Sequence, residues 1–434
     1  MTHELPSTDP SYIELRSRQF LVDESCTVAG ELLAAQVRTR HQHLADFTAL
    51  HIFVVTLRCE HSCHYCQVSR RSQNTLKYDM SHETALDAVD LAFRSPNPNI
   101  KIEFQGGEPL LNFPLLESIV LESEERNKVV GKNLAFVIAT NLAMIDDRIL
   151  DFCRSHSILL STSLDGPRDL HNANRPRPGH NSYELAVDGI RRAREVLGQD
   201  RISALMTTTE KSLTRVRDIV DEYVTQGFDR IFLRPLAPYG FALKTKSYQS
   251  YNTSRWLEFY REGIDYIIDL NRKGTDFTEF YAQVILRKML TSEDPRYVDL
   301  MSPSGIGLAA VVYNYDGYVY ASDEGRMLAE SGDFQFRLGR IPDNSYDEIF
   351  SSPRLLEPLV ESFAYSAPMC NDCAFELYCG ADPVHHWGFH KDYVGRKPES
   401  DFCKRNMELC RLLITKMEED PFAKRLFWKW ANRE

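Results

Sequence analysis

The sequence predicts an α/β fold: a partial (β/α)6 TIM-like barrel followed by a C-terminal cysteine-rich module. Three observations support this. From residue 51 onward, short apolar runs alternate with amphipathic stretches, the pattern of parallel strands joined by helices. A tight cysteine group follows the first apolar run, and a second group lies between residues 370 and 403. The alternation of apolar runs and amphipathic stretches stops near residue 237.

Composition limits the class of protein. The chain has 434 residues, of which 43% are hydrophobic and 26% charged, as in soluble globular proteins. A net charge of −11 argues against a nucleic-acid partner, which needs clustered Lys and Arg. We expect no membrane span and no signal peptide, because the sequence lacks the apolar runs that both require. Cysteines at metal-ligand spacing indicate a cytoplasmic protein rather than a disulfide framework.

The change of pattern predicts four regions. Residues 1–50 form an N-terminal extension, 51–237 the barrel core, 238–304 a helical linker, and 305–434 a cluster domain with a final helix. The expected core strands are apolar and β-branched, at 52–57, 100–104, 134–139, 158–163, 202–208 and 230–235. The helices between them are expected near 82–94, 113–128, 146–154, 183–196 and 212–226. In such sheets the active site lies at the carboxyl ends of the strands.

The first cysteine group, Cys59, Cys63 and Cys66, has C-x3-C-x2-C spacing directly after the first strand. Thiolates suit iron–sulfur clusters and zinc, but three ligands close neither a four-iron cluster nor a tetrahedral zinc site. On spacing alone two interpretations stay open. Either His61 or His64 completes a zinc site, or a [4Fe–4S] cluster keeps one iron open for chemistry.

Polar and glycine-rich motifs end the next strands in turn. A Gly-Gly-Glu sequence ends the second strand, where glycine allows close backbone approach and a carboxylate can bind an amino group. Asn141 ends the third strand, and Ser163-Leu-Asp-Gly-Pro ends the fourth. Arg175 follows, with a guanidinium that pairs well with carboxylates.

The order of these motifs resembles the signature of the radical S-adenosylmethionine (SAM) enzymes. The resemblance implies that Cys59, Cys63 and Cys66 hold a [4Fe–4S] cluster whose open iron binds SAM. Leu142 stands where the family often has glycine. The cofactor-binding residues implied by the resemblance are Tyr65, Gly106, Gly107, Glu108, Asn141, Ser163 and Arg175.

The C-terminal region begins with a predicted hairpin, because Asp316-Gly317 lies between alternating apolar residues. The cysteines beyond it suit a zinc ribbon by spacing alone, but together they resemble part of the SPASM module, which holds auxiliary [4Fe–4S] clusters. Ala309, Ser322 and Pro383 stand where a second auxiliary cluster would need cysteines. The resemblance therefore implies one auxiliary cluster, with ligands Cys370, Cys373, Cys379 and Cys403. The cysteines expected not to be ligands are Cys26, Cys153 and Cys410.

Among SPASM proteins the chain is most similar to the His-Xaa-Ser system of radical SAM peptide maturases. Stretches 66–70, 379–383 and 394–403 carry this resemblance. It implies cleavage of SAM to a 5′-deoxyadenosyl radical, which abstracts hydrogen from a ribosomally made peptide to install a C–C, thioether or ether cross-link. Asp323 resembles a general base in related enzymes.

The implied partners are a precursor peptide and a one-electron reductant such as flavodoxin or ferredoxin. Because the region before residue 51 is too short for a complete leader-recognition domain, we also expect a partner maturase or leader-binding protein. Two alternatives stay open. One is a sulfatase-maturase-like enzyme that generates formylglycine, and the other is a non-catalytic metal-binding scaffold.

Overall fold

The computed structural model describes residues 6–18, 20–21, 28–66, 70–237, 239 and 252–432. The chain divides into two compact units, Met1–Phe47 and Thr48–Glu434. The first unit contains helices α1 (Pro10–Ser17) and α2 (Ala29–His41) and the 3-10 helix η1 (Gln42–Ala45). Within the described residues, no helix combines the length and apolarity needed to cross a membrane.

Among its described residues, the second unit is built on a sheet of eight strands in the order β10-β9-β8-β1-β2-β3-β4-β5. Strands β1 to β5 are all parallel, as the alternation of strands and helices predicts. Residues 51–56 of the central strand β1 are buried without alternation, because both faces of a parallel sheet are covered. The strands are β1 (Leu50–Thr56), β2 (Asn99–Gly106), β3 (Asn133–Thr140), β4 (Leu159–Ser163), β5 (Ile202–Leu205), β8 (Ala310–Tyr313), β9 (Tyr318–Tyr320) and β10 (Arg337–Arg340).

Helices follow the core strands as expected. Ser81 caps the helix that begins at His82, since its hydroxyl accepts a hydrogen bond from the backbone N–H of Thr84 at 3.1 Å. The helices of the core are α3 (Thr75–Tyr78), α4 (His82–Phe93), α5 (Phe113–Val130), α6 (Asp147–Ser155), α7 (Arg168–Asn174), α8 (Ser182–Leu197) and α9 (Val216–Thr225). Short 3-10 turns join some of them: η2 (Pro109–Asn112), η3 (Gln199–Arg201) and η4 (Glu210–Ser212).

The expected sixth strand is much shorter than 230–235. Strand β6 covers only Arg230–Ile231 and pairs with β7 (Thr278–Glu279) instead of β5. The reason is a fully buried carboxylate: Glu279 accepts a bond from the backbone N–H of Leu233 at 3.1 Å. This hydrogen bond uses the backbone N–H of Leu233, which a longer strand β6 would need for pairing with a neighbouring strand. The same carboxylate caps the next helix through the N–H of Ala282 at 2.6 Å.

The predicted hairpin forms at β8 and β9, and Gly317 in its turn has φ +83°. An unexpected feature is that β8 pairs in parallel with β1, so the hairpin extends the core sheet across the boundary expected near 304. The ring of Phe53 on β1 lies 5.0 Å from the ring of Tyr313 on β8. One apolar core therefore continues from the barrel strands into the C-terminal region.

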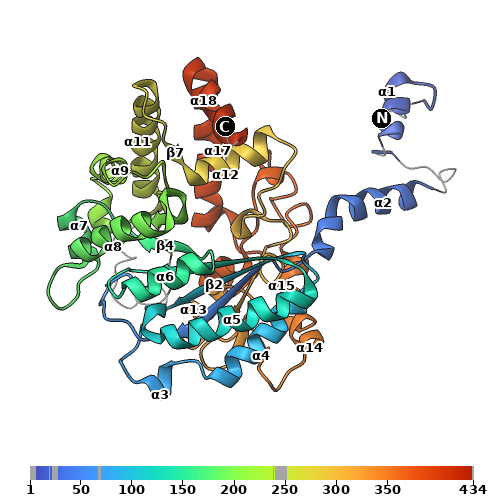
Figure 1. Ribbon diagram of the computed structural model, residues 1–434. Helices are drawn as coiled ribbons and strands as arrows, with labels where there is room; N and C mark the ends of the chain where they lie inside the picture. Colours follow the sequence, from blue (N-terminus) through green and yellow to red (C-terminus); the bar gives the residue numbers. More distant parts are fainter. Residues whose placement is uncertain are drawn as a thin grey trace. The chain divides into compact units, whose positions relative to one another are not determined.

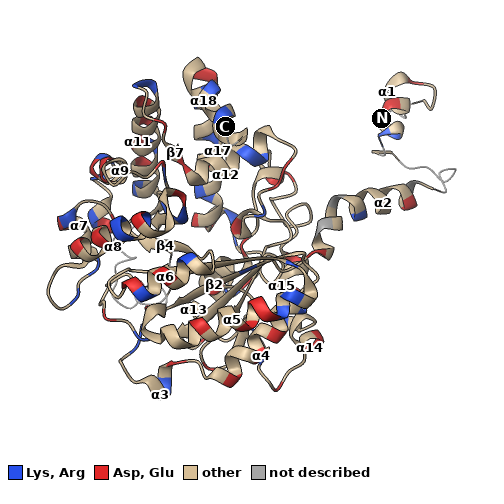
Figure 2. Cartoon of the chain, in the orientation of Figure 1, with Lys and Arg blue, Asp and Glu red and all other residues tan. Residues whose placement is uncertain are grey.

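The remaining helices complete the C-terminal half. Figure 1 shows α11 (Thr253–Arg272), α12 (Phe280–Leu290), α17 (Asp401–Glu419) and α18 (Pro421–Asn432) gathered together, and these helices contact one another. Acidic and basic residues are interspersed over the helices (Figure 2). The other elements are η5 (Val298–Leu300), α13 (Asp323–Ala329), α14 (Tyr346–Phe350), α15 (Pro353–Glu361), η6 (Glu376–Tyr378), α16 (Pro383–His390) and η7 (Lys397–Glu399).

Candidate active site

Hydrogen bonds fix the loop that carries the first cysteine group. Arg58, directly after β1, donates from Nε and Nη2 to the two oxygens of Asp79 at 2.7 and 2.8 Å. Thr56 donates its hydroxyl to the same carboxylate at 2.6 Å. Further along, the N–H of Ser62 donates to the carbonyl of Pro176 at 2.7 Å. The loop is therefore held at the carboxyl end of β1.

A cavity of about 200 Å³ at the carboxyl ends of the strands is lined by Cys59, Cys63 and Cys66 together. The cavity unites residues that lie more than a hundred positions apart in the sequence. Of the predicted cofactor-binding residues, those that line it are Tyr65, Gly107, Asn141, Ser163 and Arg175. Lining residues that sequence reasoning did not select include Arg70, Thr207 and Arg234.

The three thiols fit an iron–sulfur cluster. They line the cavity without a disulfide among them. Burial raises the pKa of the Cys63 thiol to about 12, and burial raises the pKa of Cys59 as well. A bound metal stabilises the thiolate form, which offsets the cost of burying it. Three soft ligands around one cavity suit a cluster that leaves one iron open.

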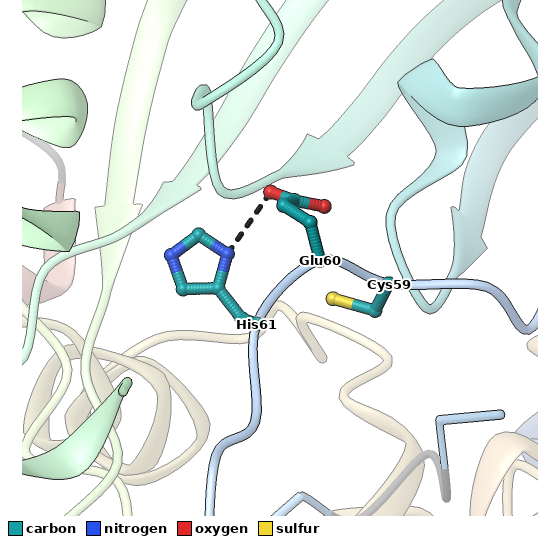
Figure 3. A group of neighbouring side chains, drawn as sticks. All are labelled: Cys59, Glu60 and His61. Atoms are coloured by element: carbon teal, nitrogen blue, oxygen red, sulfur yellow. Dashed lines mark hydrogen bonds and ion pairs between the residues drawn. The ribbon is translucent and has the colours of Figure 1, made fainter. Parts of the chain in front are cut away.

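The zinc alternative depends on the neighbours of Cys59. Ligand atoms of Cys59, Glu60 and His61 lie within 4.8 Å of one another (Figure 3). However, Nδ1 of His61 is hydrogen-bonded to Glu60 at 2.9 Å, and Asn141 donates to the same Glu60 oxygen at 2.8 Å. His64 lines a different cavity. His61, in contrast, lines the first cavity together with the three cysteines.

The Gly-Gly-Glu motif packs the end of β2 against the end of β1. A Cβ on Gly106 would clash with the carbonyl of Thr56, and one on Gly107 with the carbonyl of Arg58. The N–H groups of Gly107 and Glu108 donate to those same carbonyls, each at 2.8 Å. Glycine is thus required here by the protein's own backbone, and Gly107 still borders the cavity.

Glu108 is fully buried beneath the cavity. Its carboxylate accepts bonds from the Thr140 hydroxyl at 2.6 Å, the Asn141 N–H at 2.8 Å and the Leu110 N–H at 3.1 Å. Burial, followed by the charge of Glu60, raises the pKa of Glu108 to about 8. The carboxyl group therefore ties the end of β3 to β2 and positions Asn141. Direct contact of Glu108 with a cofactor stays a prediction.

Leu142, at the position where glycine was expected, adopts φ +62°, in the left-handed region. A side chain in this conformation costs roughly 1–2 kcal/mol. The strain is tolerated because the leucine is 1% exposed and packs on Gly189 of α8, where a Cβ would clash with it. The backbone shape typical of glycine is therefore retained with a buried apolar side chain.

Asp165 organises the wall of the cavity, although sequence reasoning did not select it. This fully buried carboxylate accepts bonds from the Tyr65 hydroxyl at 2.6 Å and from Arg175 at 3.0 and 3.2 Å. The N–H of Thr207 approaches it at 3.3 Å, and the Arg175 guanidinium lies 5.5 Å from the Tyr65 ring centre. Arg175 is thus already paired. The sequence feature that could have identified Asp165 is its position two residues beyond Ser163, at the end of β4.

A second cavity of about 210 Å³ shares Tyr65 with the first. Asn174 on its wall is 4% exposed, and its Nδ2 has no hydrogen-bond partner in the described part of the chain. Tyr65 therefore lines both cavities. This position agrees with the predicted contact between the Tyr65 ring and SAM but does not test it.

The second cysteine group gathers around the start of α17. Cys403 lies in the first turn of that helix, where Ser400 accepts its N–H at 3.2 Å. The N–H of Phe375 donates to the sulfur of Cys373 at 3.4 Å, and Asn406 donates to the sulfur of Cys379 at 3.6 Å. Hydrogen bonds to sulfur are typical around iron–sulfur ligands. The pKa of Cys403 is raised by burial first and then by Cys370 and Cys373, which places these thiols near one another; that the four cysteines bind one cluster stays a prediction.

The other cysteines differ in their surroundings. Cys153 is 1% exposed in the apolar core, as expected, and Cys26 lies outside the described residues. Cys410 is buried on α17, and burial raises its thiol pKa to about 12, with smaller contributions from Cys379 and Cys373. Cys410 is therefore close to the auxiliary ligands, which its distance in sequence did not indicate.

Asp323 begins α13, and one of its oxygens accepts a bond from Nε of Arg326 at 3.1 Å. It is not among the residues that line the first cavity. Its neighbour Glu324 has a pKa raised to about 7, by burial first and then by Asp299 and Asp323. Arg234, which lines the cavity, lowers the pKa of Glu324. The role of Asp323 as a base stays a prediction within this interior group of carboxyls.

Comparisons with known proteins agree with this geometry. Residues 53–222 match the model of the Radical SAM superfamily. An uncharacterised protein of Methanocaldococcus jannaschii is 31% identical over 189 residues, which is 43% of this chain and 62% of that protein. The cysteine-type anaerobic sulfatase-maturating enzyme of Clostridium perfringens is 22% identical over 335 residues, covering 74% of this chain and 84% of the enzyme.

Solved structures share the fold. Native anSMEcpe with bound AdoMet superposes with a TM-score of 0.68 at 18% identity, over 89% of this chain and all of that one (100%). Streptococcus suis SuiB bound to precursor peptide SuiA gives a TM-score of 0.58 at 14% identity, over 90% of this chain and 87% of that one. The predicted fold class is confirmed.

Proposed function

We propose that the protein is a radical SAM enzyme, which cleaves SAM reductively and modifies a ribosomally synthesised peptide; the match of residues 53–222 to the Radical SAM superfamily supports this. The observation that carries the proposal is the single cavity shared by Cys59, Cys63 and Cys66 with Ser163 and Arg175. When bound there, a [4Fe–4S] cluster and SAM supply a 5′-deoxyadenosyl radical for hydrogen abstraction. The modification proposed is an intramolecular cross-link.

In this proposal, the residues of the chain bind the cluster and SAM and hold the side chains of the cavity in position. The Arg58–Asp79 pair fixes the cluster loop, and Glu108 positions Asn141 at the cavity. Asp165 holds the Tyr65 hydroxyl so that the aromatic ring cannot swing away. Asp323 is proposed to take up the proton released on oxidation of the substrate.

A peptide substrate is supported by the likeness to SuiB, whose structure holds a precursor peptide. Within the peptide maturases we propose the His-Xaa-Ser system, on the stretches 66–70, 379–383 and 394–403. The auxiliary cluster, held by Cys370, Cys373, Cys379 and Cys403, suits passage of an electron from the substrate. We also propose a flavodoxin or ferredoxin as reductant, a separate leader-binding protein, and a cytoplasmic location, where thiols stay reduced.

A sulfatase-type maturase that generates formylglycine is the second candidate. It is favoured by the alignment with the Clostridium perfringens enzyme, which covers 84% of that enzyme. Ala309 and Ser322 stand where a second auxiliary cluster was expected to need cysteines, and this favours the cross-linking enzyme.

Anaerobic reconstitution tests the proposal. We expect about eight irons per chain, as two four-iron clusters require, and 5′-deoxyadenosine on reduction with SAM. Stoichiometric zinc without SAM cleavage would instead support the metal-binding scaffold. Mass spectrometry of a co-expressed precursor peptide then separates the two enzymes. Oxidation of Ser to formylglycine and formation of a cross-link both remove two hydrogens, so tandem mass spectrometry has to separate them. Two linked residues without an aldehyde indicate a cross-link, whereas an aldehyde that reacts with a hydrazine indicates the sulfatase-type reaction.

A further inference from the structure

Lys397 differs from the other lysines near the C-terminal cysteines. It is only 7% exposed, and its ammonium donates to the backbone carbonyl of Val394. Within the part of the chain that the structure describes, no carboxylate forms an ion pair with it. Lys288, in contrast, is paired with Asp294 at 3.3 Å. A buried charge is costly unless an opposite charge offsets it, which points to an anionic group beside Lys397.

The short helix η7 directs Lys397 to the inside of the protein. Arg396 and Glu399 on the same turn are exposed and form an ion pair at 3.6 Å, whereas Lys397 is the buried residue of the turn. The N–H of Ser400 donates to the carbonyl of Lys397 at 3.2 Å. The Ser400 hydroxyl in turn accepts the N–H of Cys403 at 3.2 Å. Two hydrogen bonds therefore link Lys397 to a cysteine at the start of α17.

The charge of Lys397 acts on two of the four predicted ligands. Burial raises the thiol pKa of Cys370, and Lys397 is the next contribution, which lowers it. Burial and then Cys370 raise the pKa of Cys403, and Lys397 again lowers it. Because Cys370 and Cys403 are far apart in the sequence, the ammonium lies near the place where the cysteine group converges.

The chemistry of the anionic group follows from these thiols. A [4Fe–4S] cluster with four thiolate ligands carries two negative charges when oxidised and three after it gains one electron. A nearby cation stabilises the reduced form more than the oxidised form, because the attraction grows with the charge of the cluster. Net charge is one of the factors that set the reduction potential of an iron–sulfur cluster.

We propose that Lys397 is the counter-charge of the auxiliary cluster and raises its reduction potential. The effect favours the step in which the substrate radical loses one electron and the cluster gains it. Lys397 acts through the cluster, so it is a positioning residue and not a catalytic one. The proposal rests on the proposed function, because it assumes that the C-terminal cysteines hold a four-iron cluster.

The test is a redox titration of the anaerobically reconstituted holoenzyme, followed by electron paramagnetic resonance. The signal that changes when SAM is added belongs to the cluster of the first cysteine group, and the other signal belongs to the auxiliary cluster. We expect Lys397→Met to lower the equilibrium constant for reduction of the auxiliary cluster about tenfold, a fall of about 59 mV in its potential. The potential of the other cluster should not change, because Lys397 is not among the residues that line the first cavity.

Two further variants separate charge from packing. Lys397→Arg keeps the positive charge and should shift the equilibrium constant by less than about threefold. Lys404→Met removes a lysine that directly follows Cys403, but Lys404 is exposed and donates to the hydroxyl of Ser254 at 2.7 Å. Water screens the charge of Lys404, so its loss should change the constant by less than about twofold.

An unchanged potential of the auxiliary cluster in Lys397→Met overturns the proposal. So does an equal shift in Lys397→Arg, which would show that packing matters and charge does not, or an equal shift in Lys404→Met.

If Lys397→Met loses the auxiliary irons, Lys397→Gln replaces it in the titration. Loss of these irons in both neutral variants but not in Lys397→Arg supports the counter-charge, and loss in all three refutes it. A wild-type holoenzyme with only about four irons would instead show that the proposed auxiliary cluster itself is wrong.

Discussion

Replacement of Asp165 by Asn should lower the free energy of unfolding far more than the same replacement of an aspartate on the protein surface. The carboxylate is fully buried and accepts bonds from Tyr65, Arg175 and Thr207. Asparagine keeps one acceptor oxygen and places an NH2 group against donors. The guanidinium of Arg175 then stays buried without its counter-charge. Removal of one partner of a buried pair costs roughly 3–5 kcal/mol.

A nearby pair provides the control. Asp169, four residues further on, forms an ion pair with Arg215, but its side chain is 70% exposed. Exposed pairs contribute about 0–1 kcal/mol, so Asp169→Asn should be nearly neutral. Both variants change Asp to Asn within one short segment, and they differ mainly in burial.

The assay is urea unfolding followed by circular dichroism, with SAM affinity measured in parallel. We expect Asp165→Asn to lower the free energy of unfolding by roughly 3–5 kcal/mol and to weaken SAM binding, because Tyr65 and Arg175 line the cavity. A loss below about 1 kcal/mol, or equal losses in the two variants, would refute the claim that burial makes this pair important.

Three other predictions follow from the structure. Cys59→Ala should abolish SAM cleavage while the auxiliary cluster stays bound, as iron content and electron paramagnetic resonance would reveal; retained cleavage contradicts the assignment. Cys403→Ala should lose about four irons and Cys410→Ala none, and the reverse result would make Cys410 the ligand. Burial lowers the pKa of His51 from 6.5 to about 4, so its contribution to stability is present above pH 6.5 and is lost as pH falls through 4. Over that window wild type should lose ~3 kcal/mol more than His51→Phe in urea unfolding, and equal losses would disprove it.

The sequence alone was sufficient to predict the class of protein. C-x3-C-x2-C spacing after an apolar run, with motifs at the ends of the next three strands, depends only on local order along the chain. Parallel strands bring their carboxyl ends to one edge, so the shared position of Cys59, Asn141 and Ser163 was predictable. The match of residues 53–222 to the model of the Radical SAM superfamily agrees with that prediction, and the fold is shared with solved structures. The peptide and the bond formed remain proposals.

Tertiary structure decided which polar side chains are committed to each other. The motifs named Glu108 and Arg175 as cofactor contacts, and this stays a prediction. The structure adds that Glu108 accepts three hydrogen bonds from the protein and that Arg175 is paired with Asp165. Such pairings depend on distances between separate strands, which no local pattern encodes. The parallel pairing of β8 with β1 is equally non-local. The sequence by itself determined the chemistry at the strand ends, and the tertiary structure decided which of those groups are left to meet a ligand, because burial forces each polar group to find a partner.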